Sequence, residues 1–192
     1  MRRSLLLVLV LLTTALYGAA TLQPTRYEVT PQSRFWIDGT STVGAYTCAA
    51  EAVSGYGILG EGRELAAEVA VPVRAFDCGS APQNRDFYRA LRADAHPAIR
   101  FELERAETLD AEARPGAPVR VRTTGTLRIA GAARRVTLEA TGRRLADGRV
   151  ALQGSLPLRM TDFGVEPPSH ALGLIRAHDA IVARFDLVAA AR

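Results

Sequence analysis

Alternation of apolar and polar residues with a period of two constrains the fold of this chain more than any other feature. Residues 119–129 read VRVRTTGTLRI, so that valine, glycine, leucine and isoleucine fall on one face and arginine on the other. A period of two places successive side chains on opposite faces of a strand. The same alternation recurs at 65–73, 99–103, 135–142, 149–160 and 181–187, and more weakly at 33–38 and 41–53. The sequence therefore predicts about eight long antiparallel strands with one apolar face.

Turn residues separate these segments. Gly131 and the pair Asp147-Gly148 are typical of tight hairpin turns. Pro72 and Pro157 interrupt strand patterns, so we expect each at an edge, a strand start or a bulge, where no ladder hydrogen bond is lost.

One helix is predicted, at about 81–93. Ser80 and Gln83 have the spacing of a capping box, and Phe87 and Leu91 lie one turn apart on one face. His96-Pro97 is expected to end the segment. The predicted fold class is all-β, an antiparallel barrel or sandwich with one short helix.

The inner faces of the predicted strands contain several small residues. A barrel of eight strands is just wide enough to be filled by side chains or to hold one small ligand. Small inward residues either leave room for a ligand or mark places where strands bend or approach closely, and the pattern alone leaves both readings open. These residues are Gly44, Ala67, Gly125, Ala140, Gly154 and Ala183.

Residues 1–20 have the pattern of a signal peptide. Arg2 and Arg3 precede the apolar run Leu5–Leu12, and small residues end at Ala20, after which we expect cleavage. The protein is then periplasmic or secreted, and residues 21–192 form one domain. Removing residues 1–20 lowers the formal net charge from +4 to about +2, and the arginines are dispersed among acidic residues. We therefore expect no nucleic-acid partner.

Residue types needed for catalysis are scarce. The chain contains no lysine, which excludes Schiff-base and P-loop chemistry, and His96, His170 and His178 have no neighbours at metal-ligand spacing. We expect no enzyme, no catalytic residue, no metal and no cofactor. A weaker alternative is a hydrolase or isomerase that uses His170 or Asp162.

Cys48 and Cys78 are the two cysteines of the chain. In an exported protein two cysteines indicate one disulfide, and two buried free thiols are the alternative.

Five segments together resemble the YceI-like family of exported bacterial proteins. They occur in order along the mature chain, over about 26–190: VPVRAFDCG (71–79), ADAHPAIRFEL (93–103), GTLRIAGAARRVTLEATG (125–142), MTDFGVEPPS (160–169) and VARFDL (182–187). The resemblance implies an antiparallel eight-stranded lipocalin-like barrel that holds a long isoprenoid. It supplies no catalytic motif, and residues 35–48 and 167–179 depart from the commoner pattern.

The leading hypothesis is an exported carrier or sequestering protein for a polyisoprenoid or quinone-type lipid, with transient membrane contact. Such a tail needs an apolar lining. A filled barrel that acts as a structural or protein-interaction module is the alternative. The candidate lining residues are Phe35, Phe76, Phe101, Leu103, Leu127, Leu156, Met160, Phe163 and Phe185.

Overall fold

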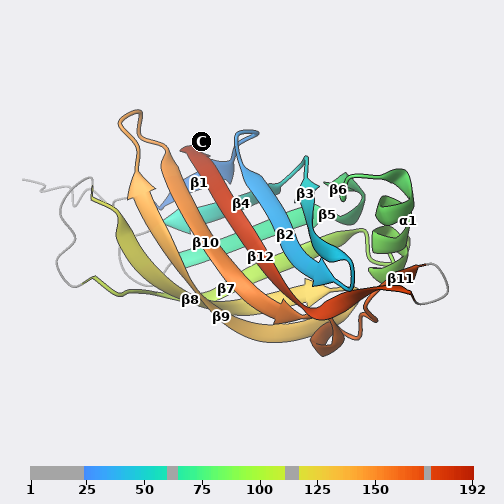
Figure 1. Ribbon diagram of the computed structural model, residues 1–192. Coiled ribbons are helices and arrows are strands. Elements are labelled where there is room, and N and C mark those ends of the chain that lie inside the picture. Colours follow the sequence, from blue (N-terminus) through green and yellow to red (C-terminus); the bar gives the residue numbers. More distant parts are fainter. Residues whose placement is uncertain (1–23, 60–64, 111–116, 171–173) are drawn as a thin grey trace, which may run out of the picture.

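Eight antiparallel strands form a closed ring (Figure 1). The computed structural model describes residues 24–59, 65–110, 117–170 and 174–192. Within these residues the chain has one α-helix, so the predicted antiparallel eight-stranded barrel with one short helix is confirmed. The predicted signal peptide lies outside the described residues. In ring order the strands are β1 (Thr25–Val29), β4 (Ser54–Leu59), β5 (Leu65–Pro72), β7 (Ala98–Thr108), β8 (Val119–Ile129), β9 (Ala132–Arg144), β10 (Val150–Arg159) and β12 (Ile175–Ala191).

The ring widens at one end because strand β12 changes partners. On one edge β12 pairs with β10, and on the other it pairs first with β2 (Arg34–Ser41) and then with β1. β3 (Gly44–Ala50) pairs with β2, and the two-residue strand β6 (Phe76–Asp77) pairs with β3. Of the weakly patterned residues 41–53, Ser41 ends β2 and Gly44–Ala50 form β3.

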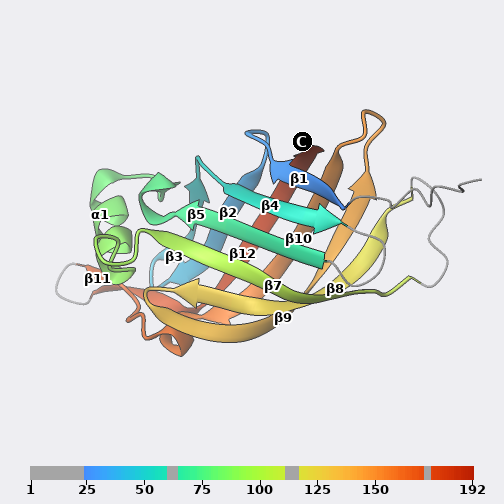
Figure 2. The ribbon, with the colours of Figure 1, turned by 180° about the vertical axis from the view of Figure 1, so that it is seen from behind.

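Helix α1 (Ala81–Ala90) lies at this widened end, between β6 and β7 in the chain (Figure 2). Ser80 caps its first turn, because its hydroxyl accepts a hydrogen bond from the backbone N–H of Gln83 and donates one to the side-chain oxygen of Gln83. The helix ends at Ala90, before the predicted end at about 93. Arg92 adopts a left-handed φ of 52°, and the N–H of Ala93 bonds back to the carbonyl of Tyr88, which closes the helix.

Two further local predictions, one for a turn and one for a proline in a strand, agree with the structure. Ile129 pairs with Ala132, and the two residues between them, Ala130 and Gly131, have φ values of 48° and 85°, as a type I′ hairpin turn requires. Pro157 lies where β10 is paired with β12 alone, because the β9–β10 ladder stops at Gly154. Pro157 therefore has no partner strand on the β9 side, in keeping with the predicted edge position.

Two inward glycines lie under aromatic rings. A Cβ added at Gly125 would stand 2.6 Å from Cζ of Phe101, and one added at Gly154 would stand 2.6 Å from Cζ of Phe185. These two positions therefore mark close approach. The reading that their small size leaves empty space is wrong, because each ring occupies the room that the glycine provides.

We expect Gly125→Ala to lower the free energy of unfolding by about 1–3 kcal/mol, as overpacked core positions do. A Cβ there overlaps the carbonyl oxygen of Glu102 as well as the Phe101 ring. Urea unfolding of the variant measures the loss. Gly142→Ala on the neighbouring strand is the matched control, because its Cβ would lie an ordinary 3.5 Å from Leu152. Equal stability of Gly125→Ala and the wild type would contradict this account.

Candidate ligand cavity

An apolar cavity of about 430 Å³ occupies the end of the barrel next to α1. This volume lies within the range of ~300–1,000 Å³ that small-molecule sites have. Its walls come from α1, the β2–β3 hairpin, the near ends of β7, β8, β10 and β12, and the short 3-10 helix η2 (Met160–Phe163). The widening of the sheet separates these elements and leaves space that α1 covers without filling.

Four of the nine predicted lining residues line this cavity: Phe35, Leu127, Met160 and Phe163. Phe163 is buried, and it projects from η2 together with Met160. Of the small inward residues, Gly44 and Ala183 also line it.

The other five predicted residues lie elsewhere. Phe76 is 1% exposed and belongs to the closed core behind the cavity. Phe101 and Phe185 cover the two glycines described above, and Leu103 lies on β7 beyond Phe101. Leu156 borders a second hollow instead. These five residues do not line this cavity. Period-two alternation identifies the inner face of a strand but not the depth of a residue along the barrel.

Several lining residues were missed by the sequence analysis. Ile99, Ile129, Leu158 and Ile181 stand on the same inner rows as the predicted residues, nearer to α1. Ile99 follows α1 closely in the chain, so its place near the helix could have been expected from the sequence. The other three residues come near α1 only through strand pairing, which no local signal in the sequence indicates.

Tyr46 supplies a hydroxyl in this apolar lining. Its ring lies against Gly39, the residue opposite it on β2, where a Cβ would overlap the ring. Burial raises the pKa of the Tyr46 hydroxyl, so the group is a neutral donor and acceptor near pH 7.

The remaining polar lining groups take part in local contacts. Ser41 donates to the carbonyl of Gly44 at 2.9 Å, and Arg159 donates to Asp179 at 2.9 Å. Asp86, on α1, pairs with Arg89 at 2.9 Å. The polar groups at the rim thus hold the wall in place.

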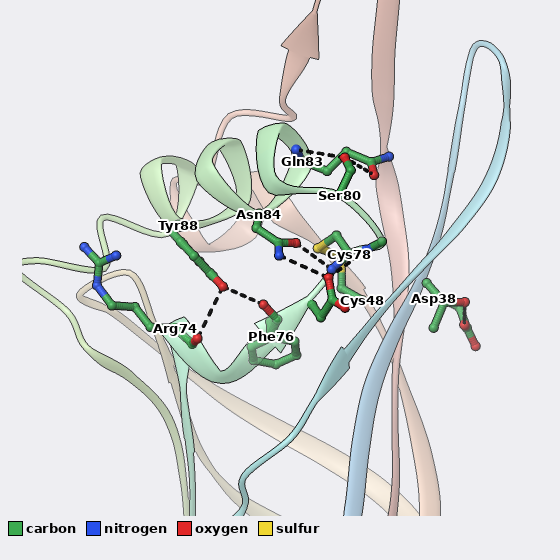
Figure 3. The surroundings of a disulfide bond; sticks show 12 residues. Asp38, Cys48, Arg74, Phe76, Cys78, Ser80, Gln83, Asn84 and Tyr88 are labelled. Atoms are coloured by element: carbon green, nitrogen blue, oxygen red, sulfur yellow. Dashed lines mark hydrogen bonds between the residues drawn. A yellow bond between two sulfur atoms is a disulfide. The ribbon is translucent and has the colours of Figure 1, made fainter.

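A disulfide joins Cys48 on β3 to Cys78, two residues before the helix cap (Figure 3). Both cysteines line the cavity. Closing a loop of 30 residues stabilises a fold by roughly 3–4 kcal/mol on the chain-entropy model. The bond therefore fixes the start of α1 to the barrel wall.

Side chains of α1 add further anchors. The side chain of Asn84 accepts from the N–H of Cys78 at 2.7 Å and donates to Asp77 at 3.0 Å (Figure 3). The N–H of Gly79, and then Asn84, lower the pKa of Asp77. The Tyr88 hydroxyl donates to the carbonyl of Phe76 at 2.7 Å. These contacts hold the helix over the cavity.

A second hollow, of about 910 Å³, lies beside the β9–β10 gap and is wider open. The β9–β10 ladder ends at Gly154, whereas β10 continues to Arg159, so the two strands separate there. Tyr46, Leu158 and Phe163 border both hollows.

Among the described residues, no group of three or more His, Cys, Asp or Glu residues lies at metal-binding distance. His178 shares a hydrogen bond of 2.8 Å with Thr40, and the His96 ring lies against Gly131. The side chain of His170 lies outside the described residues, and Asp162 is exposed on η2.

None of the described helices has the length and apolarity needed to cross a bilayer.

Asp179 fixes η2 and therefore the position of Met160 and Phe163. Its carboxylate accepts hydrogen bonds of 2.9 Å from the backbone N–H of Thr161, from the Thr161 hydroxyl and from Arg159. The Thr161 N–H, followed by Arg159, lowers the pKa of Asp179. The ionised carboxylate is therefore the form that the folded state favours.

We expect this contact to stabilise the fold above the ordinary aspartate pKa of ~3.9 and to be lost as the pH falls through the lower pKa of the folded state. The wild type should therefore be more stable than Asp179→Asn at pH 7, and the difference should shrink toward pH 2. Urea midpoints across this range measure it, with Asp162→Asn as the control for a lost neighbouring charge. A difference that is constant down to pH 2 would refute the assignment.

Known structures share this architecture. BcnA of Burkholderia cenocepacia has a TM-score of 0.67 at 19% identity, and the match covers 83% of this chain and 97% of that chain. A polyisoprenoid binding domain from Saccharophagus degradans has a TM-score of 0.69 at 14% identity, with coverage of 88% and 100%. The YceI protein of Campylobacter jejuni has a TM-score of 0.57 at 17% identity, with coverage of 76% and 84%. At such low sequence identities, the similarity to these structures shows a shared fold.

A comparison with curated proteins finds no match. The model of a family described as the YceI-like domain matches residues 21–189, nearly the whole chain beyond the predicted signal peptide. The chain therefore belongs to the YceI-like family.

Proposed function

We propose that this protein binds a polyisoprenoid or quinone-type lipid in the cavity beside α1 and acts as its carrier or sequestering protein. The observation that carries the proposal is the apolar cavity of about 430 Å³ at the α1 end of the barrel. The Saccharophagus degradans neighbour, a polyisoprenoid binding domain, supports the choice of ligand class.

The lining suits a ligand that offers only apolar surface. Each buried CH₂ contributes about 0.8 kcal/mol. Burial of some ten to fifteen carbons offsets the ordering costs and leaves roughly micromolar affinity. The neutral Tyr46 hydroxyl can hydrogen-bond an oxygen of the ligand. We propose binding without bond cleavage, because Ser41 and Arg159 are engaged in contacts of the wall.

The alternative, a filled barrel that serves as an interaction module, requires an interior without room for a chain. The half of the barrel beside α1 does not meet that condition, because the cavity lies there. The cavity therefore favours ligand binding over the alternative.

Export is part of the proposal. We propose that residues 1–20 are removed and that the protein acts in the periplasm or outside the cell. The Cys48–Cys78 disulfide supports an oxidising compartment.

Filling the cavity should abolish binding. Ala183 lines it from β12, so Ala183→Phe places a ring where the tail would lie. We expect at least a tenfold loss of affinity for farnesyl diphosphate, measured by competition against a fluorescent farnesyl analogue. Ala49→Phe is the matched control, because Ala49 is exposed on the outer face of β3. Wild-type affinity in Ala183→Phe would place the ligand elsewhere, and a wild type that binds no prenyl compound would overturn the proposed function.

Apolar residues at the cavity mouth support transient membrane contact. Val43 is 70% exposed on the β2–β3 hairpin, and Leu174 is 78% exposed next to the start of β12. The Thr42 hydroxyl donates to the carbonyl of Leu174 at 3.1 Å, so these two segments meet at the mouth. We propose that these side chains touch the bilayer surface while the lipid enters or leaves.

We expect Leu174→Asp to slow lipid transfer between phosphatidylcholine vesicles several-fold, because a carboxylate resists entry into the bilayer surface. Leu174 does not line the cavity, so the affinity in solution should be unchanged. Ala146→Asp, in the exposed loop between β9 and β10, is the control for added charge. Equal transfer rates for both variants and the wild type would exclude contact at this mouth.

A further inference from the structure

Most polar side chains in the wall of the cavity are already engaged by other groups of the protein. Ser41 donates to the carbonyl of Gly44 at 2.9 Å. The side-chain oxygen of Gln83, an exposed residue in the first turn of α1, accepts from the Ser80 hydroxyl at 2.8 Å. The two charged groups each belong to an ion pair. The polar side chains that line the cavity are Ser41, Tyr46, Gln83, Asp86 and Arg159.

The Tyr46 hydroxyl differs from the other four groups, because no described residue forms a hydrogen bond with it. Burial is the single cause that raises its pKa, so no group of the described chain replaces the water that the hydroxyl has lost. No described side-chain oxygen or nitrogen is both fully enclosed and unpartnered. The hydroxyl therefore opens onto the space that its ring borders, where a ligand oxygen can supply the missing partner.

Gly39 fixes the position of this hydroxyl. Tyr46 is paired with Gly39 across the β2–β3 ladder, and the hydroxyl end of its ring occupies the place where a Cβ at position 39 would stand. The ring therefore lies over β2. Tyr46 also borders the second hollow, together with Leu158 and Phe163. The hydroxyl thus stands where the two hollows share a wall, next to apolar side chains.

The charges of the cavity wall do not favour an anionic head group. Arg159 and Asp86 are the charged residues of the lining, so its formal charge is zero. Arg159 is already neutralised by Asp179 at 2.9 Å. A diphosphate that entered this cavity would lose its water without meeting an unpaired cation, which is costly. An uncharged carbonyl oxygen needs only one donor, and a neutral tyrosine supplies it.

We infer that Tyr46 determines head-group specificity by donating a hydrogen bond to the carbonyl oxygen of an uncharged prenyl lipid, such as a prenyl ketone or a prenylquinone. This inference rests on the proposed lipid-binding function, which leaves the head group open. The apolar wall contributes to affinity through the carbons that it covers, and it does so equally for any head group. Discrimination between head groups therefore falls to the hydroxyl.

The test compares three ligands built on the same farnesyl skeleton: farnesylacetone, which carries a ketone, the hydrocarbon farnesene, and farnesyl diphosphate. Competition against a fluorescent farnesyl analogue gives the affinity of each for the wild type and for Tyr46→Phe. We expect Tyr46→Phe to bind farnesylacetone about three- to tenfold more weakly, which corresponds to the loss of one hydrogen bond. The affinities for farnesene and farnesyl diphosphate should change by less than about twofold, because neither uses the hydroxyl.

Tyr56→Phe is the matched control, because it removes a hydroxyl from β4, outside both hollows. All three affinities should remain at their wild-type values. A second measurement reads the bond directly: the infrared carbonyl stretch of ¹³C-labelled farnesylacetone should shift to lower frequency in the wild-type complex than in dry alkane. This shift should be absent in Tyr46→Phe, and its presence in the wild type tests the bond even if Tyr46→Phe does not fold.

The outcomes separate this inference from the proposed function. Equal weakening of all three ligands in Tyr46→Phe would show that the side chain only shapes the wall, and would overturn the specificity role while leaving lipid binding intact. Unchanged binding of farnesylacetone, or an unshifted carbonyl stretch in the wild type, would do the same. Tighter wild-type binding of farnesyl diphosphate than of farnesylacetone would also overturn it, and would assign the head group to cations such as Arg134 and Arg135 of the second hollow. A folded wild type that binds none of the three ligands would overturn the proposed function, and the role of Tyr46 with it.

Discussion

The hydrogen bonding of β12 determines the shape of this molecule. One edge of the strand is occupied by β10 over ten residue pairs, and the other edge is divided between β2 and β1. Pairing with β1 closes the ring, and pairing with β2 widens the sheet at the α1 end. A strand can form one ladder on each edge, so this division of a single edge closes the ring at the β1 end and leaves an open half at the α1 end.

The open half requires a cover, and α1 provides it. The helix is held by the Cys48–Cys78 bond, by the hydrogen bonds of Asn84 and Tyr88, and by Phe87, whose ring centroid lies 4.9 Å from that of Phe76. Cys48, Cys78 and Phe87 line the cavity, whereas Asn84 and Tyr88 do not. The helix is therefore fixed in part by contacts outside the cavity, which do not depend on a ligand. Such prior organisation lowers the cost of binding, because the site does not have to be ordered by its ligand.

Two inward glycines show how small residues serve the packing of this barrel. Gly125 and Gly154 make room for the rings of Phe101 and Phe185, and neither ring lines the cavity beside α1. The space that each glycine leaves is thus taken by a ring of a neighbouring strand.

Much of the fold could be predicted from the sequence, because alternation with a period of two depends only on local side-chain geometry. It identified the inward rows correctly, including Leu127 and Ala183, and Gly131 and Gly148 located two turns. The helix start at Ser80 followed from its capping residues, but the helix end did not, because an arginine at position 92 takes the left-handed conformation that usually requires glycine.

By itself the sequence determined which face of each strand is apolar, and hence an all-β barrel with one helix. It did not determine how deep each inward residue lies, so Phe101 and Phe185 were expected beside Phe35 as lining. Depth depends on which strands pair at which register, and these pairings join residues far apart in the chain, such as Phe35 and Phe185. Only the tertiary structure decided that Gly125 and Gly154 hold rings while Gly44 and Ala183 border empty space, because the size of an interior depends on the side chains that meet across it.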